Sequence, residues 1–303
     1  MALDDLLGRV LGHVSRLTIR RLGPPGAFLV EDGSGPSVAT ATDAQDANPS
    51  APTVLLPRAE VPEGAKAGDE LEVFVYLDSD DRPVATRGAP RLELGEVTFL
   101  TVSDVGRFGA FVDWGLPKEL LVPFAEQTRD VNVGERHPIG LYVDKTGRLA
   151  GTMRVSEMLG TGPEAWSLDE WVEGEAWRNE PDIGLFVIVE RARVGLVPAN
   201  EPHALTRGQP ARFRVTNVLP DGKIELSLRG LAHEELESDA RAILAVLARG
   251  DAAGVGRVGN QSTPEEIRSL FGLSKKAFKR AVGRLLKERA VEFDGDGFLR
   301  PTR

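Results

Sequence analysis

The chain has 303 residues, of which 41% are hydrophobic and 27% are charged. These values are ordinary for a soluble globular protein of more than one domain. Cysteine is absent, which excludes disulfides and thiolate metal sites and favours a reducing, cytoplasmic location. No apolar run reaches the roughly 18 residues that a membrane-spanning helix needs, so we expect none.

The net charge of −9 is unfavourable for binding a polyanion, but the charge is unevenly distributed. Residues 1–90 carry 8 basic and 14 acidic side chains, whereas residues 232–303 carry 13 basic and 11 acidic ones. Within that last segment, residues 275–289 hold seven basic residues and one acidic residue. Any attraction for nucleic acid therefore has to come from local cationic clusters, and the densest one is in the C-terminal segment.

Three segments repeat the same four signals in the same order, which indicates a repeated domain. The first signal is glycine, a small or apolar residue and phenylalanine, at residues 26–28, 109–111 and 184–186. The second is an apolar stretch that ends in proline, at Pro57, Pro123 and Pro198. A glycine that precedes an alternating strand follows, at Gly68, Gly134 and Gly208. The last is a basic residue before a final strand, at Arg82, Arg148 and Lys223.

Each segment has the alternating or short apolar patterns of about five strands. This pattern predicts a small five-stranded Greek-key β-barrel of the OB type, whose second and third strands form a ligand-binding face. A generic β-sandwich is the alternative. The predicted barrels span residues 1–90, 91–155 and 169–230. Residues 33–52, rich in Ala, Ser, Asp and Pro, are expected to interrupt the first barrel as a surface loop, and residues 156–168 to link the second barrel to the third.

After residue 231 the apolar period becomes that of an α-helix. The helix expected over 234–247 has an apolar stripe of Leu236, Ala240, Ile243, Leu244 and Leu247. Residues 262–266 begin a second helix, because they offer a hydroxyl cap, a proline and two glutamates, and it ends near Gly272. The third helix begins at Ser274 and has an apolar face of Phe278, Val282, Leu285 and Leu286. A hairpin over 291–293 and 297–299 completes the order of a winged helix-turn-helix domain, predicted over 232–303.

The second repeat resembles the S1 RNA-binding domain. It contains Phe108-Gly109-Ala110-Phe111-Val112, then Leu121-Val122-Pro123, and later Asp144 and Arg148. The first repeat lacks the earlier phenylalanine, and the third has Ile183 in its place and Leu219 where the aspartate is expected. All three repeats have proline where many S1 domains have histidine. That difference removes one ring and lowers the affinity expected of each domain.

The order of three S1-like domains followed by a winged helix resembles the conserved virulence factor B family of bacterial RNA-binding proteins. The resemblance covers nearly all of the chain and depends on domain order more than on any single motif. It implies RNA binding and an indirect effect on gene expression at the RNA level.

Single-stranded RNA offers phosphates, which need cations, and unstacked bases, which need flat apolar faces. The candidate stacking rings are Phe28, Phe108, Phe111 and Phe186. The candidate cationic contacts in the barrels are Arg82, Arg107, Arg148 and Lys223. Phe108 and Phe111 would face opposite sides of a regular strand, but a turn at Gly109 would bring both to the surface. The alternatives are that the rings belong to the barrel cores and that the basic residues are ordinary hairpin residues.

The third C-terminal helix is the strongest cationic feature of the chain. It carries Lys275, Lys276, Lys279, Arg280 and Arg284 where a recognition helix meets a nucleic acid. A solvated helical face is the alternative.

Catalysis finds little support, because the four histidines are scattered and no P-loop, paired-carboxylate metal motif or nucleophile elbow is present. We expect no cofactor, no metal, no membrane association and no small-molecule substrate. The sequence predicts a non-catalytic, single-stranded RNA-binding protein that regulates gene expression after transcription. The alternatives are a transcription factor that binds DNA through the winged helix and a protein-binding scaffold built on degenerate OB folds.

Overall fold

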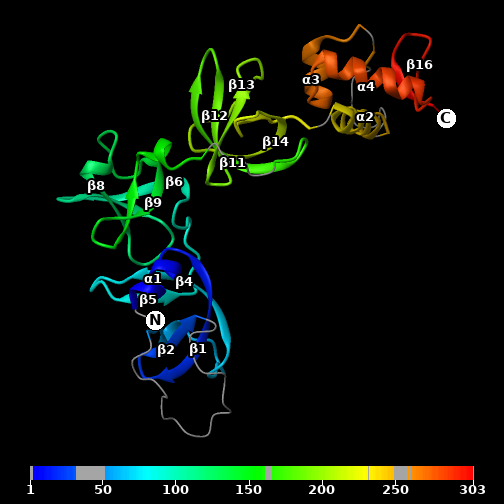
Figure 1. The fold of residues 1–303 in the computed structure, drawn as a ribbon. Helices are drawn as coiled ribbons and strands as arrows, with labels where there is room; N and C mark the ends of the chain where they lie inside the picture. Colours follow the sequence, from blue (N-terminus) through cyan, green and yellow to red (C-terminus); the bar gives the residue numbers. More distant parts are fainter. Residues whose placement is uncertain are drawn as a thin grey trace. The chain divides into compact units, whose positions relative to one another are not determined.

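The computed structural model describes residues 3–31, 52–160, 166–230, 232–248, 258–259 and 261–302. The chain forms two compact units, Met1–Leu226 and Ser227–Arg303, which are described one at a time (Figure 1). The predicted loop over 33–52 lies, apart from Pro52, outside the described residues, and so do residues 161–165 of the predicted linker.

Barrel 1 begins with a short helix that the sequence pattern did not predict, α1 (Leu3–Val10). Its strands are β1 (Val14–Gly23), β2 (Gly26–Glu31), β3 (Val54–Pro57), β4 (Glu70–Leu77) and β5 (Pro83–Thr86). They close into a barrel in the order β1-β2-β3-β5-β4. Leu6 and Val10 lie one helical turn apart and are buried in the barrel core, so α1 packs its apolar side on the strands.

Barrels 2 and 3 repeat this strand plan. Barrel 2 comprises β6 (Val97–Gly106), β7 (Gly109–Asp113), β8 (Leu120–Pro123), β9 (Arg136–Val143) and β10 (Leu149–Thr152). Its strand order is β10-β9-β6-β7-β8, the same cyclic order with β8 and β10 as the sheet edges. Barrel 3 is closed and comprises β11 (Trp171–Glu180), β12 (Gly184–Val189), β13 (Arg193–Pro198), β14 (Pro210–Val218) and β15 (Ile224–Ser227).

The glycine of the repeated glycine–phenylalanine motif has a geometric role in every barrel. Gly26, Gly109 and Gly184 begin the second strand, with positive φ values of 150°, 155° and 134°. Each pairs with the proline that ends the third strand. A Cβ atom at these positions would lie 1.9, 2.1 or 2.0 Å from a backbone oxygen of that strand. Only glycine permits this approach, which is why the signal recurs.

Apolar contacts join neighbouring barrels within the first unit. Phe74 of barrel 1 meets Trp114 of barrel 2 edge-on, with ring centroids 5.7 Å apart. Both rings are buried in one cluster with the core of barrel 2. Phe99 of barrel 2 and Ile188 of barrel 3 are buried in a second shared cluster. The barrels are therefore packed against one another rather than merely tethered.

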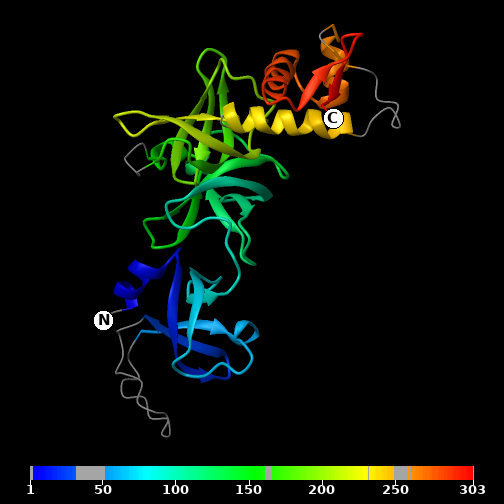
Figure 2. The ribbon, with the colours of Figure 1, turned by 90° about the vertical axis from the view of Figure 1, so that its right-hand side faces the viewer.

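The second unit has the predicted winged-helix order (Figure 2). Its elements are α2 (Ala232–Ala248), α3 (Pro264–Phe271), α4 (Lys275–Lys287), β16 (Val291–Phe293) and β17 (Leu299–Pro301). Thr263 and Glu266 form a capping box at the start of α3, and the left-handed Gly272 ends it. Ser274 caps α4 through its side chain, which accepts a hydrogen bond from the Ala277 amide at 3.2 Å.

Two details of this unit differ from the expectations drawn from the sequence. Leu286, expected on the apolar face of α4, is 36% exposed, whereas Ala281 is buried beside Phe278 and Leu285. The second hairpin strand also starts later than expected, at Leu299 rather than Gly297. The Asp294 carboxylate accepts hydrogen bonds from the amides of Asp296 and Phe298, which keeps these residues in the turn. The predicted fold class, OB-type barrels followed by a winged helix, is confirmed.

None of the helices in the described part of the chain has the length and apolar character that membrane crossing requires.

Candidate nucleic-acid interface

The rings of Phe28, Phe111 and Phe186 occupy one equivalent position on the second strand of each barrel. All three are half-buried. Across the first hairpin they pair with Arg21, Asp104 and Arg178, respectively, in each case directly after a shift of register in the first strand. The repeated bulge therefore decides which side chain faces each ring.

In barrels 1 and 3 the residue that faces the ring is an arginine. The guanidinium carbon of Arg21 lies 3.5 Å from the centroid of Phe28. That of Arg178 lies 4.5 Å from Phe186 and 4.9 Å from Trp177. A guanidinium plane over a ring supplies both a cation and a flat stacking surface. Arg21 and Arg178 were not among the residues predicted from the sequence, although both are basic residues shortly before the repeated glycine.

Barrel 2 also pairs a guanidinium group with an aromatic ring, but it uses different residues. Asp104 stands where the other barrels have arginine, and Arg107 lies over Phe108 instead, 4.4 Å from the ring centroid. The Phe108 side chain is 59% exposed in the turn between β6 and β7. An exposed ring beneath a guanidinium group is suited to stacking on an unpaired base.

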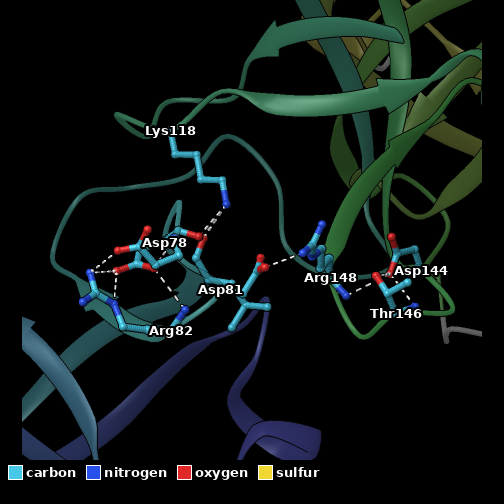
Figure 3. A network of polar contacts seen from close by, with 9 residues as sticks. Asp78, Asp81, Arg82, Lys118, Asp144, Thr146 and Arg148 are labelled. Atoms are coloured by element: carbon cyan, nitrogen blue, oxygen red, sulfur yellow. Dashed lines mark hydrogen bonds and ion pairs between the residues drawn. The ribbon is translucent and has the colours of Figure 1, made fainter. Parts of the chain in front are cut away.

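The basic residue before the last strand of each barrel forms an ion pair. Arg82 contacts Asp78 at 2.7 Å and Asp80 at 3.0 Å, and Lys223 contacts Asp221 at 2.7 Å. These hydrogen bonds hold the pKa values of Asp78 and Asp221 below their ordinary range. Arg148 of barrel 2 instead pairs with Asp81 of barrel 1 (Figure 3). Exposed ion pairs of this kind are weak, so an anionic ligand such as a phosphate group can compete for each cation.

In the second unit, α4 presents basic side chains opposite its buried face. Phe278, Ala281, Val282 and Leu285 are buried, while Lys276, Lys279 and Arg280 are exposed and Lys275 is half-buried. Arg284 is directed to Glu288, with its Nε 2.7 Å from the carboxylate. The cationic character of the helix is therefore concentrated in its first two turns.

The structure thus brings some predicted site residues together and separates others. Phe108 is grouped with Arg107, and Phe111 and Arg148 line the same cavity. Phe28 and Phe186 are stacked with Arg21 and Arg178, whereas Arg82 and Lys223 face carboxylates of their own hairpins. Each barrel presents a ring with a guanidinium group, which can bind a base and an adjacent phosphate.

Comparison with known proteins assigns both kinds of domain. Residues 49–87 and 94–154 match the family model of the S1 domain, and residues 241–298 match that of the CvfB-like winged helix domain. The chain is 28% identical over 257 residues to Conserved virulence factor B of Staphylococcus epidermidis. The aligned region covers 81% of this chain and 85% of that protein. It is 29% identical over 238 residues to Conserved virulence factor B of Staphylococcus aureus, covering 76% and 78%.

Two solved structures resemble the chain more loosely. One is a multidomain protein with nucleic acid binding domains from Streptococcus pneumoniae, with 24% identity, a TM-score of 0.39 and coverage of 96% of this chain and 98% of that chain. The other is the a/eIF2alpha–aDim2p–rRNA complex from Pyrococcus horikoshii, with 19% identity, a TM-score of 0.21 and coverage of 41% and 86%.

Proposed function

The chain belongs, by its S1 domains and its CvfB-like winged helix, to the conserved virulence factor B family, and we propose that it binds single-stranded RNA without catalysing a reaction on it. We further propose that the protein regulates gene expression after transcription by binding alone. S1 domains and winged helices are nucleic-acid-binding modules, and the finer choice of single-stranded RNA depends on the surface of the barrels.

The observation that carries the proposal is the exposed ring of Phe108 with Arg107 above it. Unpaired bases offer their faces to such a ring, whereas the bases of a duplex are stacked on one another and hidden. Arg21 with Phe28 and Arg178 with Phe186 repeat the ring and guanidinium pair in the other two barrels. The surface therefore favours unpaired bases over the edges of a duplex groove.

The charge of the chain limits how it can bind. With a net charge of −9, the protein as a whole repels a polyanion, so affinity has to come from stacking and from local cations. The basic first turns of α4 are the densest of these cations, and we infer that they contact RNA phosphates. Affinity should therefore be modest for each barrel and should fall as salt rises.

A DNA-binding transcription factor is the second candidate function. It is favoured by one observation, the N-capped α4 with lysines in its first turn, which is where a recognition helix contacts DNA. The barrels have no role in such a factor, although they make up most of the chain.

The experiment that tests the proposal is the affinity of Phe108→Ala for a mixed-sequence single-stranded RNA. Loss of one stacked base should weaken binding by about 1–3 kcal/mol, or roughly five- to 150-fold, without lowering Tm. Ile183→Ala is the matched control, because Ile183 is also exposed (52%) before the same glycine in barrel 3 but has no ring. Equal effects of the two variants would contradict a stacking role for Phe108.

A further inference from the structure

A cavity of about 340 Å³ opens where barrel 1 meets barrel 2. Barrel 2 contributes Phe111, Trp114 and Arg148 to its walls, and barrel 1 contributes Tyr76 and Asp81. Its volume is at the small end of the range for ligand sites, which suits a group the size of one nucleoside. Two predicted RNA-binding residues of barrel 2 therefore line a cavity that only the neighbouring barrel completes.

The aromatic part of the cavity is fixed in place. Trp114 is 2% exposed, its indole Nε1 donates to the Lys118 carbonyl at 2.5 Å, and its ring packs edge-on against Phe74. Tyr76 is half-buried and packs against the same apolar cluster, and its burial raises the pKa of the phenol. The hydroxyl therefore stays protonated at neutral pH and can donate a hydrogen bond. Tyr76, Phe111 and Trp114 form an aromatic side of the cavity, and its other walls include the charged side chains of Asp81, Lys118, Glu119, Asp144 and Arg148. The aromatic side is suited to the face of a flat heterocycle, and the Arg148 cation to a phosphate.

The turn between β4 and β5 of barrel 1 forms the opposite wall and is tied to barrel 2. The Asp78 carboxylate accepts hydrogen bonds from the amides of Asp80 and Arg82, at 2.9 and 3.0 Å. The Lys118 ammonium group of barrel 2 donates to the carbonyls of Leu77 and Asp78, at 2.9 and 2.8 Å. Figure 3 shows these contacts beside the Arg148–Asp81 ion pair. The turn is thus held against barrel 2 by backbone contacts that do not use Asp81.

We propose that this cavity holds one unstacked base of the bound RNA, and that Arg148 exchanges Asp81 for the phosphate of that nucleotide. The inference rests on the proposed function and names the place where barrel 1 and barrel 2 act as one site. The ion pair is accessible to a phosphate, because the Arg148 and Asp81 side chains are 58% and 41% exposed. Asp81 is the competitor that the phosphate has to displace.

The first test fills the cavity. Ser79 is exposed and lines the cavity on the barrel 1 side, so Ser79→Trp places a ring where the base would lie. Ser156→Trp is the matched control, because Ser156 is also exposed but does not line the cavity. Fluorescence anisotropy with a labelled 12-nucleotide uridine-rich RNA should show about tenfold weaker binding for Ser79→Trp and an unchanged affinity for Ser156→Trp. Wild-type affinity of Ser79→Trp would overturn the cavity as a base site.

The second test removes the competing carboxylate. Asp81 has a φ of 59°, a left-handed conformation that asparagine tolerates, so Asp81→Asn should keep the turn. It should tighten binding about two- to fivefold, the effect of releasing one cation from an exposed ion pair. Asp80→Asn removes the same charge from the same turn and should leave the affinity unchanged, because Asp80 contacts Arg82, which Asp78 still holds, and not Arg148. Equal affinities of Asp81→Asn, Asp80→Asn and the wild type would overturn the exchange at Arg148.

Failure of this inference is distinguishable from failure of the proposed function. A wild-type chain that does not bind the RNA contradicts the function itself. A wild-type chain that binds, with Ser79→Trp and Asp81→Asn both indistinguishable from it, leaves the function intact and removes only the cavity between the barrels.

Discussion

At the level of single residues, the repeated contact between a guanidinium group and a ring is the main feature of the barrels. Arg178 lies over both Trp177 and Phe186, so its planar group has aromatic faces beneath it and can stack on a base above them. A lysine in its place would keep the positive charge and lose the plane. Substitution by lysine therefore separates the stacking role of Arg178 from its charge.

We predict that Arg178→Lys weakens binding of single-stranded RNA several-fold and leaves the salt dependence of affinity unchanged, because the charge is kept and only stacking is removed. Arg191→Lys in the same barrel is the control, since Arg191 pairs with Glu96 at 3.4 Å and a lysine can do the same. Affinities measured at several salt concentrations test this. Identical affinities of both variants would show that the stack serves only the fold of the hairpin.

A second residue-level prediction concerns acid stability. Hydrogen bonds from the side chain of Asn132 and then from His137 lower the pKa of Glu135 from 4.5 to about 2. A lowered carboxyl pKa stabilises the fold fully above the unfolded value near 4.5, and this stabilisation disappears as pH falls toward 2. Glu135→Gln should therefore flatten the fall of Tm between pH 4.5 and pH 2. Glu119→Gln is the control, and equal slopes for Glu135→Gln and the wild type would contradict the assignment.

Part of this residue-level picture could be predicted from the sequence. The place of Phe108 before a turning glycine suggested a surface ring, and the structure exposes it. Arg21 and Arg178 could not be identified as ring partners, because a bulge shifts the register by one residue and decides which side chain faces the ring. Asp81 could not be matched to Arg148, since 67 residues separate them.

At the level of elements, α4 carries the basic cluster to which we assign the electrostatic part of the proposed function. Its apolar face is buried in the core of the second unit, so charge reversal on the opposite face leaves the packing intact. Each phosphate of single-stranded RNA that the protein neutralises contributes about 0.7 to the slope of log affinity against log salt.

We predict that replacing Lys275, Lys276, Lys279 and Arg280 by glutamate weakens RNA binding and lowers the salt slope by about 0.7 for each phosphate that the helix no longer neutralises. Arg241→Glu on α2 is the control, because Arg241 is exposed and pairs with Glu237 within its own helix. If the RNA affinity and its salt slope are unchanged when all four residues are glutamate, the basic side of α4 is only a solvated face and the barrels alone bind the RNA.

The helices differed in how well the sequence predicted them. The boundaries of α3 and α4 were predicted because their caps are local, with Thr263, Gly272 and Ser274 marking the ends. α1 was missed because eight residues form a marginal helix on their own. Packing of Leu6 and Val10 on barrel 1 stabilises it, and that packing is not local in the sequence.

At the level of the whole molecule, the three barrels of the first unit pack against one another. Phe74 with Trp114, and Phe99 with Ile188, bury apolar surface between successive barrels. Glu175 of barrel 3 also accepts hydrogen bonds from the Thr98 hydroxyl and the Phe99 amide of barrel 2, at 2.7 and 3.0 Å. The repeated domain could be predicted from four recurring sequence signals. The junctions between barrels could not be predicted, because their residues are not shared among the repeats.

A competition experiment tests most directly whether this acidic chain binds unpaired RNA bases. Labelled single-stranded RNA would be displaced from the full chain by unlabelled single-stranded RNA, single-stranded DNA or duplex DNA of the same sequence, at two salt concentrations. We expect single-stranded RNA to compete best and duplex DNA worst at both salt concentrations, because a duplex hides the base faces that the exposed Phe108 ring is proposed to contact. Tighter binding of duplex DNA would refute base stacking on the barrels and favour a DNA-reading winged helix.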